Sequence, residues 1–219
     1  MNLVALLALG GLTALDGTSL GQFMISRPLV AATLGGLAAG NPTAGLLAGA
    51  ILELIHLNVL PVGGVGFPET GPAGVVAGAA AATSATPGGL AVAVGVGLAW
   101  AAFGGVSVTL QRKVNGRFVP RPEHGPVSVA RLQEIHLRLI LLDFLRGVGL
   151  VLAGWVVART ALGVLAAGWP LSLANTIALL TTGGAVSLGA LVRRQGEGTS
   201  TRALFVGGVA VGLIMAAVL

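Results

Sequence analysis

The chain has 219 residues, of which 55% are hydrophobic and only 9% charged, and its formal net charge is +5. Soluble domains carry about 25% charged residues, so this composition excludes an ordinary soluble protein and predicts that lipid surrounds much of the surface. The basic residues lie mostly between apolar segments, where they indicate membrane orientation, so nucleic-acid binding is not expected. The sequence has no cysteine, which excludes disulfides, thiolate metal sites and a cysteine nucleophile.

Short apolar runs make up the first part of the chain, at 2–15, 28–40, 43–62 and 72–85. The first run lacks the basic start and the small-residue cleavage site of a signal peptide, so we expect it to be retained. The sequences DGTS, SRP, GNPT and GFPETGP interrupt the runs, and a helix needs about 20 apolar residues to cross a bilayer. Irregular backbone survives at membrane depth only where protein buries it or a watery cavity solvates it. The pattern favours broken or re-entrant helices around a substrate site, with ordinary surface loops as the alternative.

Longer apolar runs follow at 88–110, 137–168 and 170–192, and the run at 203–219 is only just long enough to span a bilayer. The polar segments 111–136 and 193–202 are both basic, which predicts that both lie in the cytoplasm. Two predicted spans separate these segments, so the orientation is self-consistent and places the C-terminus outside.

The predicted fold is therefore an all-α polytopic membrane protein in three parts. They are a membrane region with broken helices at 1–110, a basic cytoplasmic loop at 111–136, and C-terminal membrane helices at 137–219. The stretch 129–147 opens as an amphipathic helix that could lie along the membrane interface before the chain enters it.

Two patterns predict how the helices pack. Glycines four residues apart recur as Gly36/Gly40, Gly45/Gly49 and Gly74/Gly78, and such pairs let helices approach closely in lipid. Asp143 and Arg146 are three residues apart in apolar sequence, where a mutual ion pair limits the cost of burying either charge. We favour this structural pairing over a role in substrate binding.

The broken N-terminal region also carries the polar residues that could bind a ligand. They are Asp16, Gln22, Arg27, Glu53, His56, Asn58 and Glu69. Charged side chains inside a membrane are costly and are functional candidates by default. Glu53 and His56 share one helix face, and carboxylate, amide and imidazole groups together suit the hydroxyls of a sugar or another polyol.

Other functions compete with polar-solute transport at this point. The carboxylates Asp16, Glu53 and Glu69 could relay an ion or a proton, and the chain could also be a structural membrane subunit. Glu53 and His56 alone make a weak metal site, and no nucleophile accompanies the carboxylates, so we predict neither a metal, a cofactor nor a catalytic residue.

The stretch from Leu15 to Gly78 resembles the IIC permease subunit of mannose/sorbose-type sugar phosphotransferase systems. The shared motifs are Asp16, Arg27-Pro28-Leu29, Gly40-Asn41, Leu52-Glu53-Leu54-Ile55, Gly63-Gly64 and Pro68-Glu69. A weaker match continues at IHLRLILLDFLRG, with His136 and Arg146, and at TTGGAVSLGALV.

The resemblance implies a bacterial inner-membrane permease, with re-entrant hairpins and an elevator-like moving core, that binds a hexose. It implies a membrane partner, IID, and cytoplasmic IIA and IIB subunits that carry the phosphoryl chemistry and dock near 111–136, within an oligomer. Glu53 and Glu69 are the first sugar contacts implied, followed by Asn58, His56, Asp16, Gln22 and Arg27.

The sequence departs from the family at three points. Asp is commoner at the position of Glu69, the residues around His56 and Asn58 differ, and family members usually continue through a further apolar segment. The departures leave the sugar unassigned and keep open a divergent homologue with a structural or regulatory role.

Overall fold

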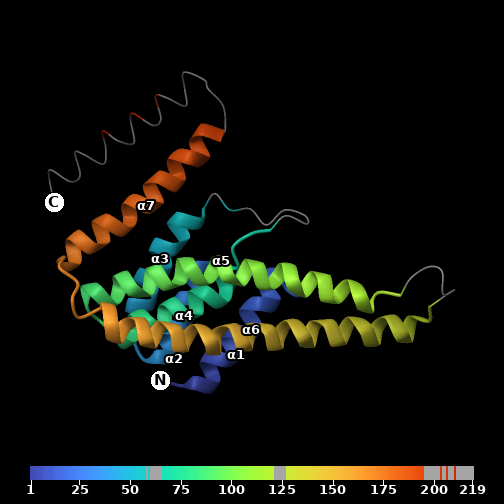
Figure 1. Ribbon diagram of the computed structural model, residues 1–219. Coiled ribbons are helices and arrows are strands. Elements are labelled where there is room, and N and C mark those ends of the chain that lie inside the picture. Colours follow the sequence, from blue (N-terminus) through green and yellow to red (C-terminus); the bar gives the residue numbers. More distant parts are fainter. Residues whose placement is uncertain are drawn as a thin grey trace.

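A computed structural model describes residues 1–57, 59, 66–120 and 127–194, together with 203, 206 and 210. These residues contain seven helices and no strand, which confirms the predicted all-α fold (Figure 1). In chain order the helices are α1 (Leu3–Thr18), α2 (Pro28–Ala39), α3 (Pro42–His56), α4 (Thr70–Thr83), α5 (Pro87–Phe118), α6 (Val129–Leu165) and α7 (Leu173–Arg194).

Local sequence sets where several of these helices begin and end. Pro28, Pro42 and Pro87 open α2, α3 and α5, where a missing N–H costs nothing and the fixed φ suits the first turn. The side chain of Asn41 caps α3 by accepting the backbone N–H of Ala44 at 3.1 Å. The predicted interruptions of the N-terminal runs therefore coincide with true helix ends.

The first four helices are too short to cross a bilayer on their own. They contain 16, 12, 15 and 14 residues, so the longest of them is about 24 Å long against a hydrocarbon core of about 30 Å. By length and composition, three described helices could span a membrane: Pro87–Phe118, Val129–Leu165 and Leu173–Ala190. The broken character of the N-terminal part is thus confirmed. The expected span at 203–219 lies almost wholly outside the described residues.

Helix α4 forms the centre of the molecule, and every residue from Gly71 to Ala81 is buried. It packs against α2 almost backbone to backbone. A Cβ atom added to Gly78 would lie 1.9 Å from the carbonyl oxygen of Ala32, and one added to Gly35 would lie 2.3 Å from that of Val75. The sequence of α4 is built from small residues because nothing larger fits between its neighbours.

The predicted close packing at the glycine pairs is confirmed at five of the six positions. Cβ atoms added to Gly36, Gly45, Gly49, Gly74 and Gly78 would all meet atoms of a neighbouring segment at 3.0 Å or less. Gly40 differs, because it has open space around it and ends α2 with a φ of +98°. Its role is the left-handed C-cap, where glycine is the residue of lowest conformational cost.

The range 111–136 is more helical than the loop expected there. Helix α5 continues to Phe118 and α6 begins at Val129, so the connection itself is short. The charged residues of 111–118 form helices well, and the first proline comes only at Pro120, so nothing breaks α5 earlier. The amphipathic start of α6 runs straight into its apolar part. The division of the chain at these boundaries stays a prediction.

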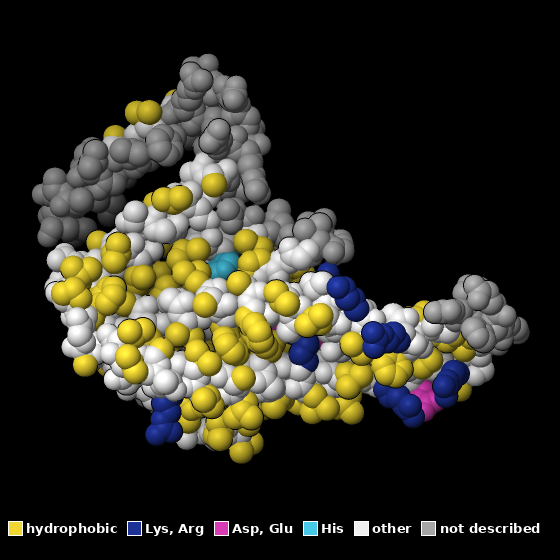
Figure 2. Space-filling model, viewed as in Figure 1, with side chains coloured by type: hydrophobic (Ala, Val, Ile, Leu, Met, Phe, Trp, Pro, Cys, Tyr) yellow, Lys and Arg dark blue, Asp and Glu magenta, His cyan; other side chains and the backbone are white. Residues whose placement is uncertain are grey.

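The surface of the long helices suits a lipid environment. Large apolar side chains such as Phe103, Val106, Val156 and Val186 are more than half exposed. Hydrophobic side chains cover much of the face in Figure 2, and Lys and Arg gather where α5 and α6 extend beyond the other helices. The apolar and basic parts of the surface are therefore separate, and the cytoplasmic location of the basic part stays a prediction.

Candidate functional site

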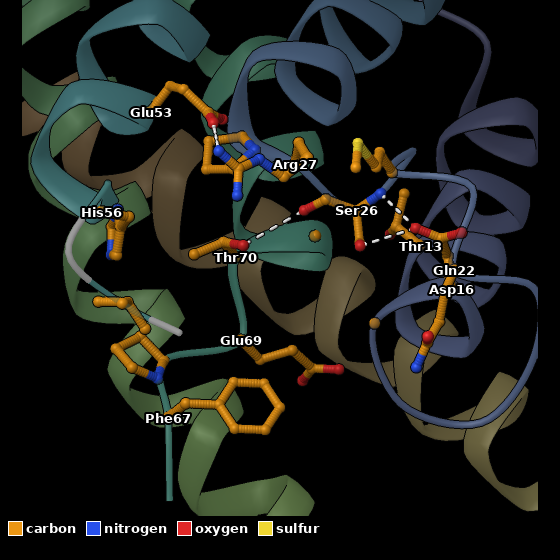
Figure 3. A pocket seen from close by; sticks show the side chains of 16 residues that line it. Thr13, Asp16, Gln22, Ser26, Arg27, Glu53, His56, Phe67, Glu69 and Thr70 are labelled. Carbon is orange, nitrogen blue, oxygen red and sulfur yellow. Dashed lines mark hydrogen bonds and ion pairs between the residues drawn. The ribbon is translucent and has the colours of Figure 1, made fainter. Parts of the chain in front are cut away.

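A polar cavity of about 340 Å³ lies where the short helices end. Its wall is formed by the end of α1, the loop before α2, the end of α3, the segment 67–69 and the start of α4 (Figure 3). The helix starts of α2 and α4 bring partial positive charge to the cavity, and the helix ends of α1 and α3 bring partial negative charge. The volume falls within the range of roughly 300–1,000 Å³ that is usual for small-molecule sites.

The carboxylate of Asp16 organises the loop that closes one side of the cavity. One oxygen accepts the backbone N–H of Phe23 at 2.5 Å, and the other accepts the N–H and hydroxyl of Ser26 at 2.9 and 2.7 Å. Gln22 and Met24 in this loop have positive φ angles of 56° and 66°, which are uncommon for residues other than glycine. Asp16 is 3% exposed, and these three donors all belong to the loop.

Glu53 connects the end of α3 to the start of α2. Its carboxylate forms an ion pair with Arg27, and one oxygen also accepts the backbone N–H of Leu29 at 3.2 Å. That N–H belongs to the first turn of α2, where a negative charge is favourable. Figure 3 shows Arg27 and Glu53 meeting at the cavity. The pairing of Arg27 with Glu53, from two different segments of the chain, was not predicted.

Glu69 is buried on the cavity wall and faces Arg146 of α6. Its two oxygens accept hydrogen bonds from both terminal nitrogens of Arg146, at 2.5 and 2.6 Å. Arg146 also donates to Asp143 at 2.8 and 3.0 Å and to the hydroxyl of Ser107 at 2.8 Å. The predicted pairing of Asp143 with Arg146 is therefore confirmed, and Glu69 is an additional partner.

Asp143 extends this network to the end of α1. The hydroxyl of Thr18 donates to its second oxygen at 2.5 Å, and the hydroxyl of Ser19 also donates to that oxygen. The network thus joins α1, α5, α6 and the start of α4 behind the cavity.

The remaining predicted residues differ in how they reach the cavity. His56 lies at the end of α3, where one ring nitrogen, Nδ1, contacts the carbonyl oxygen of Leu52 at 2.9 Å. Helix α7 covers this helix end, because Ser187 donates its hydroxyl to the carbonyl of Ile55 at 2.6 Å. Gln22 is exposed and lines the cavity, while Asn58 lies outside the described residues.

The structure brings six of the seven predicted residues to this one cavity: Asp16, Gln22, Arg27, Glu53, His56 and Glu69. Sequence reasoning missed polar wall residues with small side chains, namely Thr13, Ser26 and Thr70. Such hydroxyls are common in membrane helices, so residue type alone does not single them out. No local signal indicates the contact between Arg146 and Glu69, because the two residues are 77 positions apart.

Broken helices that converge on a polar cavity define the class of this protein as a membrane transport protein. The family described as "PTS system sorbose-specific iic component" matches residues 1–124, which is more than half of the chain. The chain belongs to this family of phosphotransferase system (PTS) components, so it is a transport subunit, and the resemblance seen in the sequence is confirmed.

Two solved structures share the fold over almost the whole chain. One is titled "Structure of membrane protein"; it is 18% identical, with a TM-score of 0.71 over 99% of this chain and 94% of that chain. The other is titled "CryoEM Structure of Mannose Transporter ManYZ and Microcin E492 (MceA) complex"; it is also 18% identical, with a TM-score of 0.60 over 99% and 93%. A comparison with curated proteins finds no match.

Proposed function

We propose that this chain is the sugar-translocating IIC subunit of a bacterial phosphotransferase complex, and that the cavity at the helix ends binds a hexose. The observation that carries the proposal is the meeting of broken helix ends and six predicted polar residues at one cavity. The sugar passes inward, and cytoplasmic IIA and IIB subunits carry out the phosphoryl chemistry. A IID subunit completes the complex in the bacterial inner membrane.

The charged groups around the cavity already have partners, which favours a ligand without charge. Arg27 pairs with Glu53, Arg146 pairs with both Glu69 and Asp143, and Asp16 is held by hydrogen-bond donors of its own loop. An ion or proton carrier would have to break one of these contacts, which is costly for charges removed from water. A hexose instead adds hydrogen bonds to groups that remain paired.

The proposal is tested by expressing the chain with candidate IID, IIA and IIB subunits in a host that lacks hexose phosphotransferase activity. Uptake of radiolabelled glucose, mannose, fructose and sorbose is then measured together with the sugar phosphate formed. We expect uptake of at least one hexose, with its phosphate accumulating inside. Flux that follows pH or membrane potential without any sugar phosphate would instead identify an ion carrier, and the absence of uptake by a correctly inserted complex would indicate a structural subunit.

A Glu53→Gln variant should lose hexose uptake while still inserting into the membrane. The amide cannot keep the ion pair with Arg27, and it weakens the contact to the N–H of Leu29. The sugar also loses a hydrogen bond to a charged carboxylate, which corresponds to about a tenfold or larger decrease in its affinity for the protein. The measurement is initial uptake against sugar concentration.

Glu134→Gln is the matched control, because Glu134 also pairs with an arginine, Arg138, at 2.5 Å. That pair is exposed on α6, and Glu134 does not line the cavity. Its affinity for the hexose should be unchanged, measured as binding by the chain alone because Glu134 lies in the segment 111–136 where we expect IIA and IIB to dock. Equal uptake by the Glu53→Gln variant would remove Glu53 from the sugar site.

A further inference from the structure

Arg146 does not line the cavity, yet it is the partner of a residue that does. Its side chain is only 10% exposed, although it sits in a long apolar helix. Burying a guanidinium is expensive unless its N–H groups are all used. The hydrogen-bond acceptors around the guanidinium of Arg146 therefore indicate the role of this residue.

All five N–H groups of Arg146 have an acceptor. The Nε and one terminal nitrogen donate to Asp143, both terminal nitrogens donate to Glu69, and one of these also donates to Ser107. Five N–H groups in a planar fork are the full donor capacity of arginine. The three partners come from α5, α6 and the residue before α4, so the guanidinium has a single orientation.

The backbone around Glu69 is held just as firmly from the side of α5. The N–H of Glu69 donates to the carbonyl of Ala101 at 2.8 Å. Cβ atoms added to Gly104 and Gly105 would lie 2.9 Å from the Cβ of Glu69 and 2.2 Å from the carbonyl oxygen of Phe67. Helix α5 thus fixes the main chain of this segment, and Arg146 fixes the carboxylate.

The carboxylate of Glu69 still has hydrogen-bonding capacity. A carboxylate offers about four acceptor positions, and Arg146 takes one on each oxygen. Glu69 lines the cavity beside Thr70 and Phe67, as Figure 3 shows. The unused positions can accept a hydroxyl hydrogen from a ligand in the cavity.

We infer that Arg146 is a positioning residue for sugar recognition, which holds the carboxylate of Glu69 in one orientation as the acceptor for a sugar hydroxyl. The inference rests on the proposed function. Lysine cannot replace arginine in this role, because its ammonium group is a point charge without the planar fork that holds two carboxylates at once.

The test measures binding of hexoses to the purified wild-type protein in detergent or nanodiscs. The hexose that binds is then compared with its monodeoxy analogues, each lacking one hydroxyl. One analogue should bind about 10- to 100-fold more weakly than the parent sugar, because its missing hydroxyl leaves Glu69 with one fewer partner.

The ratio of the affinity for the parent sugar to the affinity for the deoxy analogue is then measured for three variants, Glu69→Gln, Arg146→Lys and Arg159→Lys. In the first two variants the parent sugar should bind about tenfold more weakly. The ratio of its affinity to that of the analogue lacking the same hydroxyl should fall toward one. Arg159 lies on the same helix but is exposed and does not line the cavity, so its variant should keep the wild-type ratio.

Each result has a distinct meaning. If the wild-type protein binds no hexose, with or without its partners, the proposed function fails. If wild type binds but Arg146→Lys keeps the full deoxy penalty, Arg146 does not position Glu69, even if that variant is less stable. If the deoxy penalty also persists in Glu69→Gln, Glu69 does not accept the hydroxyl and the inference is overturned.

Discussion

A Gly78→Ala substitution should destabilise the protein by about 3 kcal/mol or more, although alanine normally favours a helix. The added methyl group would lie 1.9 Å from the carbonyl oxygen of Ala32, which is backbone and cannot rotate away. Helices α2 and α4 would have to separate, and α4 is the buried centre of the fold. The expected result is a lower thermal unfolding midpoint of the detergent-solubilised protein and less folded protein in the membrane.

Gly95→Ala is the matched control for this prediction. Gly95 lies in α5 with nothing within 4 Å of its added Cβ, so only the helix propensity changes. This variant should be neutral or more stable by about 0.5–1 kcal/mol. Equal effects of the two substitutions would show that the close contact between α2 and α4 does not contribute to stability.

The sequence predicts best the features that depend on near neighbours. Pro28, Pro42 and Pro87 mark helix starts because a proline acts on its own backbone and on the residue before it. Glycine pairs such as Gly74/Gly78 predict close packing, since in lipid only small side chains let helices approach. Gly40 shows the limit of that pattern, because its local role as a C-cap cannot be separated from packing by spacing alone.

Contacts between distant parts of the chain could not be predicted in the same way. Glu69 and Arg146 are 77 residues apart, and Thr18 and Asp143 are 125 residues apart. The sequence identifies Glu69, Asp143 and Arg146 as charges that are costly in a membrane, but it does not say which residues meet. The sequence identifies polar residues that line the cavity, whereas their ion pairs depend on how separate segments of the chain pack.

The end of α5 shows a different limit. Apolar composition predicts where lipid contact ends, near residue 110, but it does not predict where the helix ends. Charged side chains suit a helix and also suit contact with water, and here they are Arg112, Lys113 and Arg117. Helix α5 therefore continues to Phe118. Arg112 also lies 5.6 Å from the ring centre of Phe67, a cavity residue, which connects this extension to the site.

Replacing Asp16 by alanine should loosen the loop at 19–27 and weaken hexose binding about tenfold or more. The carboxylate is the acceptor for the N–H of Phe23 and for two groups of Ser26, and the loop also contains the positive φ angles of Gln22 and Met24. Without that acceptor these donors turn to water, and the strained backbone relaxes. Hydrogen exchange of the backbone amides of this loop should become faster in the variant, while exchange in α4 stays slow.

Asp16→Asn separates this role from direct sugar contact. The amide keeps one oxygen as an acceptor but brings an NH₂ group toward the remaining loop donors, so the loop should loosen to an intermediate degree. If Asp16 acts through the loop, hexose affinity and amide exchange should change together across wild type, Asp16→Asn and Asp16→Ala. Weakened binding with unchanged exchange in Asp16→Asn would instead show that the carboxylate touches the sugar. Because the carboxylate of Asp16 accepts three hydrogen bonds from this one loop, we expect the two measurements to change in parallel.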